Sequence, residues 1–414
     1  MRAQALGHEC KLFIRRYDQW KRPIGRGLCE RVPDFHPWLR WADLILLEGN
    51  SVYMTEADRW RAEGLAVIGG GVKSASWETD RALGMRIFRK AGVPVPAYRE
   101  FTDYDDARAY VERRGEPFAS KPCSATDDKA LSYVAKSAED LIFMLTRWKR
   151  KHGKPQSPFI LQEKVSGIEF AVGGWFGPAG FAPGWEENFE HKKLMPGDIG
   201  PNTGELGTVM RLVSRSKLAE RVLVPLEEEL ARIGYIGNID VNTLIDEDGN
   251  PWPLEFTMRF GWPAFNIELA LHSGDFIEFL SCIASGQTIP KSFRALNRAA
   301  CGVVMAIPDF PYSHATRREV VGLPLYGLTD QVAENWHPCE MMKGEETELC
   351  SAGDYIGLAT GTGATVREAC RGAYSTLEKL SMPASPFWRN DIGRGLARQL
   401  PRLHEHGYAL GLEY

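Results

Sequence analysis

Two apolar segments joined by a five-residue turn constrain the fold of this chain more than any other feature. The segments are IGNIDVNTLI and PWPLEFTMRF, and the stretch between them is DEDGN. The Asp-Gly step is a strong signal for a tight turn, and the flanking residues are rich in β-branched and apolar types. The pattern predicts a β-hairpin over residues 235–257.

Acidic residues on this hairpin predict a metal site. A turn centred on 247–248 places Asp240 opposite Glu255, and a turn centred one residue later places Asp240 opposite Thr257. In both registers the three side chains share one face, and facing Cβ atoms lie ~5 Å apart. Carboxylates at that separation repel each other unless a cation lies between them, and a hard divalent ion such as Mg²⁺ meets that need. From these residues alone, two solvent-facing acids on an edge hairpin are an equal alternative.

Composition excludes several classes of protein. The chain has 414 residues, enough for about two to four domains. Its hydrophobic fraction of 44% and charged fraction of 25% are near globular averages, which excludes disordered, collagen-like and coiled-coil chains. Lys and Arg number 50 against 54 Asp and Glu, a net charge of −4, so no overall field attracts nucleic acid.

Local composition further narrows the expected ligands and cellular location. The basic stretch 15–40 is more typical of a solvated surface than of a contact for a phosphorylated ligand. No apolar run approaches the ~18 residues of a spanning helix, and the first residues lack the apolar segment of a signal peptide, so we expect a cytoplasmic protein with no membrane partner. The eight cysteines form no CxxC pair, which favours reduced, mostly buried thiols over a zinc site.

The order of patterns predicts three domains, at 1–72, 73–294 and 295–414. Short apolar runs alternate with helical patterns in the first, which indicates a small parallel α/β unit with a buried strand at 43–49. Its first residues read as a helix already under way, so we expect the usual first strand and its loop to be missing. A mixed α+β middle and a smaller C-terminal part with strand-like runs follow.

Periodicity places individual elements in the second and third domains. One helix is expected from Ser74 to Gly92, because the pattern stops at a glycine with prolines beyond it. The other elements expected are helices at 105–115, 138–151 and 365–380 and strands at 117–122, 159–165, 169–176, 301–307 and 354–361.

Two lysines near the end of the strand at 117–122 are candidates for binding phosphate. Lys121 precedes the polar loop PCSATDDKA, which contains Lys129. A lysine in this position acts on phosphate as a point charge. Alone, the feature is weak evidence.

A connector and a polar loop supply two further candidate sites. In LQEKVSGIE, Gln162, Glu163 and Val165 are placed on a short connector that can offer backbone groups to a purine edge, and Glu169 begins the next strand with a carboxylate for ribose hydroxyls. The stretch HKKLMPGDIGPNTGELG at 191–207 has no hydrophobic period. A polar loop this long inside a compact domain is often functional, and its composition suits an anion or an amino acid.

In this order, these features resemble those of the ATP-grasp ligases, and of the phosphoribosylamine-glycine ligase family in particular. HKKLMPGDIGPNTGELG resembles that family's HK…GD.GPNTGGMG loop, EFTMRFGWP resembles EFNARFGDPE, and RNDIGRGLARQL at 389–400 resembles its R.DIG segment. The resemblance covers nearly the whole chain. It implies an ATP-grasp fold with a truncated N-terminal Rossmann-like domain and a small β-rich C-terminal domain.

The resemblance also implies roles for individual residues. Lys121 would bind the ATP phosphates, Gln162, Glu163 and Val165 would border the adenine, and Glu169 would hold the ribose.

Further roles concern the metal, the transferred phosphoryl group and the carboxylate substrate. Glu255 would be a principal Mg²⁺ ligand and Asp240 a second carboxylate, with Thr257 beside them. Arg259 would steady the transferred phosphoryl group together with Lys121. The residues implied to face the carboxylate substrate are Lys192, Asp198, Asn202 and Thr203.

The chain departs from the family at several of these positions. The glycine-rich flap KADGLAAGKG aligns with KPCSATDDKA, which keeps both lysines and none of the glycines, so the side chains of Ser124, Thr126 and Lys129 would replace backbone contacts with phosphate. Arg81 stands where the family has a second nucleotide-binding lysine, and Thr257 stands where it has the asparagine of the metal site.

The function implied is that of an ATP-dependent carboxylate-amine ligase that forms an amide through an acyl phosphate. We expect ATP and Mg²⁺ as cofactors, glycine or another amino acid as the carboxylate donor, and an acceptor other than, or altered from, phosphoribosylamine. The alternatives are an ATP-binding protein of this fold that has lost catalysis and a ligase that modifies a nucleotide or nucleic-acid group.

Overall fold

The computed structural model describes residues 1–15, 23–124, 132–312, 318–346 and 348–414. The chain divides into two compact units. Unit 1 comprises Met1–Ile45, Pro183–Ser216 and Gly261–Tyr414, and unit 2 comprises Leu46–Ala182 and Lys217–Phe260. Each unit contains residues from more than one of the three predicted domains, whose boundaries fall after residues 72 and 294. The three-domain division stays a prediction.

Unit 1 is built around antiparallel strands in the order β11-β14-β19-β23-β20. These strands are β11 (Trp185–Glu190), β14 (Gly207–Val213), β19 (Ala299–Ala306), β23 (Tyr355–Gly363) and β20 (Trp336–Pro338). The helices of unit 1 are α1 (Arg2–Ala5), α10 (Ala264–Leu269), α11 (Phe276–Ser285), α12 (Asp330–Ala333), α13 (Val366–Leu377) and α14 (Leu396–Glu405), with 3₁₀ turns at His36–Trp38 and Arg318–Val320. Two-stranded pairs complete it, formed by β1 (Lys11–Leu12) with β2 (Glu30–Arg31), β12 (Lys193–Met195) with β13 (Ile199–Asn202), β17 (His272–Ser273) with β18 (Arg294–Ala295), and β21 (Met341–Lys343) with β22 (Leu349–Ser351).

Helices cover both faces of the unit 1 sheet. On one face α13 lies close to β23, because Gly361 and Gly363 have no side chain between the strand and the helix backbone. On the other face Ile267 of α10 packs over Gly302 in a core with Val304 and Leu358. Apolar residues that alternate along each strand therefore meet a helix on either side.

Unit 2 contains strands in the order β16-β15-β9, with β10 paired to β9. These are β16 (Pro251–Thr257), β15 (Gly237–Ile245), β9 (Ile168–Gly177) and β10 (Gly180–Phe181). A second sheet has the order β5-β8-β6-β7, from β5 (Tyr98–Phe101), β8 (Phe159–Glu163), β6 (Phe118–Pro122) and β7 (Tyr133–Val134). The remaining elements of unit 2 are α3 (Met54–Ala62), α4 (Val72–Thr79), α5 (Arg81–Lys90), α6 (Tyr104–Arg114), α7 (Ala138–His152), α8 (Lys217–Val222), α9 (Glu227–Arg232), a 3₁₀ turn at Val224–Leu226 and β4 (Val67–Ile68), which pairs with β3 (Ile45–Leu46).

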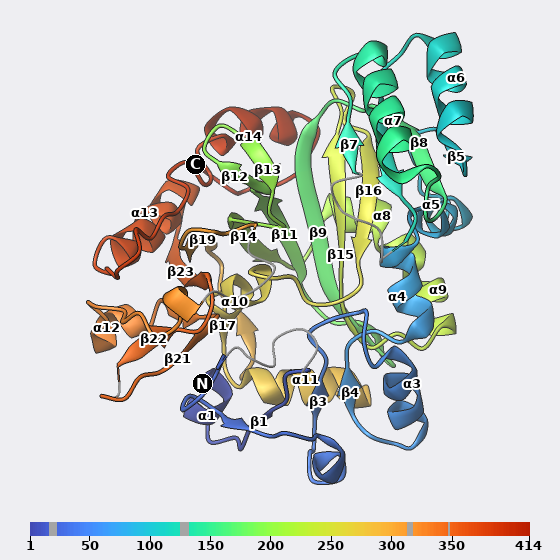
Figure 1. The fold of residues 1–414 in the computed structure, drawn as a ribbon. Helices are drawn as coiled ribbons and strands as arrows, with labels where there is room; N and C mark the ends of the chain where they lie inside the picture. Colours follow the sequence, from blue (N-terminus) through green and yellow to red (C-terminus); the bar gives the residue numbers. More distant parts are fainter. Residues whose placement is uncertain (16–22, 125–131, 313–317, 347) are drawn as a thin grey trace. The chain divides into compact units, whose positions relative to one another are not determined.

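Helices α6 and α7 form one core with the four-stranded sheet (Figure 1). Leu141, Leu145 and Trp148 recur at three- and four-residue spacing and pack with Phe118 and Phe159. The Ser137 hydroxyl caps α7 by accepting from the Asp140 N–H at 3.2 Å. The helices predicted at 105–115, 138–151 and 365–380, the hairpin, and the strands predicted in the second and third domains are confirmed within a few residues.

The single helix predicted from Ser74 to Gly92 is wrong. Asp80 adopts an extended conformation between α4 and α5, and its carboxylate accepts from the Leu83 N–H at 3.0 Å. An acid that caps a helix in this way ends the helix before it and begins the next one. The break makes Arg81 the first residue of α5.

Other expectations are corrected by burial and strand length. The stretch at 43–49 contains a strand of two residues, and the Leu46 side chain is exposed rather than buried. Three of the eight cysteines are buried and five are partly exposed, so most thiols are not buried. None of the helices in the described part of the chain has the length and apolar content needed to cross a membrane.

Candidate nucleotide and metal site

Four oxygen-bearing side chains share one face of the β15–β16 hairpin. Asp240 lies opposite Thr257, and Asn242 lies opposite Glu255. The first pairing is the register that follows from the later of the two predicted turn positions. Since residues two apart on a strand point the same way, the four side chains form a square of hard donors. Asn242 was missed by sequence reasoning, although the two-residue period from Asp240 marks it.

The neighbouring strand β9 extends this face. Asp240 pairs with Gly173 and Asn242 pairs with Ala171, so the two smallest residue types lie beside the square. Glu169, two residues before Ala171, falls on the same face. The structure therefore brings the candidate ribose ligand onto the face of the candidate metal ligands.

The opposite face of the hairpin is apolar and fixed by aromatic packing. Phe256, between Glu255 and Thr257, stacks on Phe88 of α5 with ring centroids 4.0 Å apart and planes at 7°. Trp77 of α4 lies 5.4 Å from the same ring. The alternation of strand side chains thus ties the oxygen face to a rigid aromatic core.

Arg81 connects helix α5 to the oxygen face. One terminal nitrogen, Nη2, donates a hydrogen bond to the Glu255 carboxylate. The other, Nη1, is buried and makes no hydrogen bond within the described part of the chain. A buried, positively charged donor in this state suits an anionic ligand such as a phosphate oxygen.

A second ion pair lies in the same unit, between Arg259 and Glu78. Arg259 lies two residues beyond the end of β16 and approaches Glu78 of α4 to 3.4 Å. The other Glu78 oxygen accepts from the Met258 N–H at 2.7 Å. Burial raises the pKa of the Glu78 carboxyl, while the Arg259 charge and the Met258 N–H oppose that rise. Glu78 therefore fixes both the backbone and the side chain at the end of the hairpin, and no sequence motif pointed to it.

Lys121 reaches the same hairpin from the second sheet. It lies on β6 opposite Ile160, and its Nζ lies 3.5 Å from the carbonyl oxygen of Leu254. Leu254 is the extra residue where the β15–β16 register shifts. Ser124 follows in a bend just beyond β6, and the candidates Thr126 and Lys129 lie outside the described residues.

The predicted adenine connector is shorter than expected. Gln162 and Glu163 are the last two residues of β8 rather than part of a connector, and of the three candidates only Val165 lies in the coil before β9. The Glu163 N–H already donates to the Ala97 carbonyl at 2.8 Å, and its carboxylate pairs with Arg114 at 3.1 Å. These geometries follow from strand pairing with distant residues, which the local sequence does not encode.

The stretch predicted as an irregular polar loop contains a hairpin in unit 1. Lys193 pairs with Asn202 and Met195 pairs with Ile199, which corrects the prediction. Positive φ angles of 75° and 55° at Gly197 and Asp198 form the turn between the strands.

The other candidate residues of this stretch make local contacts. Thr203 donates to the Lys192 carbonyl through its N–H at 2.9 Å and its hydroxyl at 3.0 Å. The Lys192 ammonium pairs with Glu190 at 3.0 Å. Together with Asn202 on β13 and Asp198 in the turn, they place the four candidate substrate residues on one hairpin and its ends.

The chemistry of these residues fits a divalent cation and a nucleotide. Two carboxylates, an amide and a hydroxyl are the oxygen donors that Mg²⁺ accepts, usually completed by substrate phosphates and water. The described residues contain no cluster of three His, Cys, Asp or Glu side chains that could hold a metal ion. Protein side chains of these types alone therefore do not complete the coordination shell of a cation here. The Arg81 guanidinium against Glu255 shows that the face accepts a positive charge.

Comparison with known proteins defines the class. Residues 79–265 match the family described as phosphoribosylglycinamide synthetase, ATP-grasp (A) domain. The biotin carboxylase domain of the Hydrogenobacter thermophilus 2-oxoglutarate carboxylase, solved with MgADP, superposes with a TM-score of 0.65 at 15% identity over 98% of this chain and 94% of that chain. The chain has the ATP-grasp fold and is an ATP-grasp ligase of the kind that forms C–N bonds, as its motifs predicted.

Within that class, the similarity is to phosphoribosylamine–glycine ligase. The enzyme of that name from Salmonella typhimurium is 28% identical over 356 residues, which cover 83% of this chain and 81% of the relative. The Thermotoga maritima structure of that name superposes with a TM-score of 0.71 at 20% identity, over 88% of this chain and 90% of that chain. The resemblance inferred from the motifs is confirmed, and residues 79–265 are an ATP-grasp domain of the phosphoribosylglycinamide synthetase type.

Proposed function

We propose that the chain joins the carboxylate of an amino acid, glycine or another, to an amine in a reaction that converts ATP to ADP and phosphate. The observation that carries the proposal is the face formed by Asp240, Asn242, Glu255 and Thr257, with Arg81 bonded to one of its carboxylates. Hard oxygen donors beside a guanidinium whose buried Nη1 makes no hydrogen bond in the described part of the chain match what a metal-bound triphosphate needs.

Each residue of unit 2 has a separate task in this proposal. Glu255 and Asp240 would hold Mg²⁺, which when bound neutralises charge on the phosphate oxygens. Lys121 and Arg81 bind phosphate oxygens as cations. Arg259, held by Glu78, stabilises the charge that develops as the phosphoryl group transfers.

The reaction has two steps. A carboxylate oxygen of the amino acid attacks the γ-phosphorus, the bond from that phosphorus to the β-γ bridging oxygen breaks, and ADP leaves. The nitrogen of the amine then attacks the carbonyl carbon of the acyl phosphate, loses a proton to solvent, and expels inorganic phosphate with the former carboxylate oxygen. Positioning and electrostatic stabilisation supply the rate in both steps.

An altered acceptor is part of the proposal. The phosphoribosylamine-glycine ligase family resembled here has Asp-Pro-Glu where this chain has Trp262, Pro263 and Ala264. The Trp262 ring packs beside Tyr355 at 5.8 Å, and burial raises the pKa of the Tyr355 hydroxyl. An aromatic surface in place of two acids supports an acceptor with different polarity from phosphoribosylamine.

The proposal is tested by measuring ADP formation from Mg-ATP with each amino acid and a panel of amines. Amino-acid-stimulated ADP release with an amide product identified by mass spectrometry is expected. Glu255→Gln is expected to abolish ADP formation while the far-ultraviolet circular dichroism stays unchanged. Intact Mg-ATP binding without stimulated ADP release would overturn the proposal and leave an ATP-binding protein that does not catalyse.

A further inference from the structure

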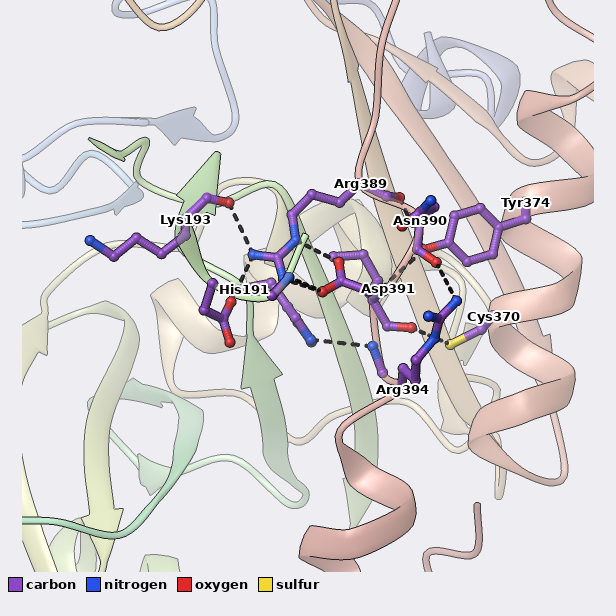
Figure 2. Close-up of polar contacts among 12 residues, drawn as sticks. His191, Lys193, Cys370, Tyr374, Arg389, Asn390, Asp391 and Arg394 are labelled. Carbon is purple, nitrogen blue, oxygen red and sulfur yellow. Dashed lines mark hydrogen bonds and ion pairs between the residues drawn. The ribbon is translucent and has the colours of Figure 1, made fainter. Parts of the chain in front are cut away.

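A buried arginine in unit 1 holds the hairpin of residues 191–207. Arg389 is completely buried, and its Nε and Nη2 donate to the two oxygens of Asp391, each at 2.8 Å. Its Nη1 donates to the carbonyl of Lys193 at 3.0 Å and to the Asp198 carboxylate at 2.8 Å (Figure 2). Figure 2 shows that Lys193 offers only its carbonyl to the guanidinium, while its ammonium extends away.

The backbone around Arg389 makes further bonds to the same hairpin. The Gly197 N–H, in the turn, donates to Asp391 at 2.8 Å. The Gly393 N–H donates to Nε2 of His191, at the base of the hairpin, at 3.3 Å. The segment 389–393 therefore holds both ends of the hairpin, and we call this segment the clasp.

The clasp itself is fastened to helix α13. The Tyr374 hydroxyl donates to the Arg389 carbonyl at 3.0 Å and accepts from the Ile392 N–H at 3.0 Å (Figure 2). The Cys370 thiol lies 3.4 Å from the Ile392 carbonyl. Because α13 packs closely on β23, the clasp has a rigid support on the sheet of unit 1.

Backbone bonds of His191 with Leu206 and Gly207 join the base of the hairpin to the unit 1 sheet, but the strands β12 and β13 beyond that base have no apolar core of their own. No residue of β12 or β13 is buried, and the paired side chains of Met195 and Ile199 are 48% and 60% exposed. A two-stranded hairpin without an apolar core is marginal in water. A buried ion pair is weak evidence for stability, and a role in fixing one geometry accounts better for a charge kept completely buried here.

We propose that Arg389 is a positioning residue that fixes the 191–207 hairpin in the geometry that receives the carboxylate substrate. The inference rests on the proposed function, which assigns this hairpin to that substrate. It changes the role of Asp198, whose carboxylate holds Arg389 rather than the substrate. The clasp acts on substrate affinity through the backbone of the hairpin and touches neither ATP nor the reacting atoms.

Kinetics with glycine as the probe test the inference. The lysine ammonium places its donors on a single nitrogen and cannot span both Asp391 and the hairpin as the guanidinium fork does, so Arg389→Lys is expected to raise the glycine KM at least tenfold with kcat and ADP affinity within twofold. Tyr374→Phe, which loosens the clasp without touching a charge, is expected to raise KM about threefold. Arg394→Gln is the matched control, because the exposed side chain of this arginine donates, among the described residues, only to the Asn390 carbonyl.

Hydrogen exchange supplies a readout that does not depend on activity. In Arg389→Lys the amides of 193–202 are expected to exchange at least tenfold faster, while those of β19 and β23 keep their rates. Asp198→Asn retains an acceptor for Arg389 and is expected to preserve KM better than Asp198→Ala.

Specific outcomes overturn the inference. Unchanged hairpin exchange in Arg389→Lys would do so, as would uniform acceleration over unit 1, which indicates a general structural role. Equal losses in Asp198→Asn and Asp198→Ala would return Asp198 to direct substrate binding. A wild-type chain that makes no ADP with any amino acid contradicts the proposed function instead, and the exchange experiment still decides whether the clasp orders the hairpin.

Discussion

Arg81→Gln separates metal binding from nucleotide binding, because Arg81 contacts the candidate metal ligand and also carries a donor for phosphate. Its guanidinium is bonded to Glu255, so a cation that binds Glu255 must first displace it. The side chains are 25% and 31% exposed, and ion pairs with that access to water contribute about 1 kcal/mol. Removing the pair is therefore expected to tighten Mn²⁺ binding about fivefold when no nucleotide is present.

The same variant is expected to weaken nucleotide binding. The buried Nη1 of Arg81 is lost, and a charge-assisted hydrogen bond is worth about 1.5–3 kcal/mol. ADP is thus expected to bind at least tenfold more weakly, whereas Arg81→Lys keeps the charge and much of the affinity. Opposite signs for the metal and the nucleotide distinguish this mechanism from general damage to the site.

The assay uses electron paramagnetic resonance of free Mn²⁺ for the metal and calorimetric titration for ADP. Arg86→Gln is the control, because Arg86 lies on the same helix and pairs with Glu100 at 3.0 Å on the exposed surface. It is expected to change neither affinity. Mn²⁺ affinity that stays the same or falls in Arg81→Gln would show that Arg81 does not compete with the cation for Glu255.

Three further predictions concern stability, its pH dependence and catalysis. Phe88→Ala is expected to lower the free energy of unfolding by about 3–5 kcal/mol in urea titrations, because Phe88 is buried and stacks on Phe256; a loss under 1 kcal/mol would contradict this packing. Burial, with Arg2, lowers the pKa of His337 to about 4, so its neutral form stabilises the fold above pH 6.5 and about 3 kcal/mol is lost as pH falls to 4. His337→Asn should flatten that part of the stability curve, and an unchanged curve would count against it. Glu78→Gln removes the charge that holds Arg259 and is expected to lower kcat at least tenfold with ADP affinity within twofold, whereas an unchanged kcat would show that Arg259 needs no such support.

Strand periodicity made the oxygen face predictable from sequence. The two-residue period and the Asp-Gly turn place Asp240, Glu255 and Thr257 together whichever register is chosen, and the structure confirms that shared face. The same two-residue period also places Asn242 on this face. The prediction left Asn242 out because it followed the family motif. Local pattern is sufficient here because the hairpin closes over few residues.

Contacts between segments far apart in the chain could not be predicted from the sequence. Glu78 meets the Met258 N–H across 180 positions, and Arg389 meets Asp198 across 191. No local pattern shows these two contacts, because each depends on which segment the fold brings beside the acid. The cap at Asp80 is different, since an aspartate inside a helical pattern is a recognisable start signal that the apolar period outweighed.

Transfer of an oxygen atom from the amino acid to phosphate is the direct signature of an acyl phosphate intermediate. The chain would be incubated with Mg-ATP, glycine or whichever amino acid stimulates ADP formation, labelled with ¹⁸O in its carboxylate, and hydroxylamine as a general amine acceptor. A ligase that works through an acyl phosphate leaves one ¹⁸O in each inorganic phosphate released and none in ADP, and mass spectrometry of the phosphate is expected to show this. Phosphate without ¹⁸O from a reaction that consumes ATP would contradict the account.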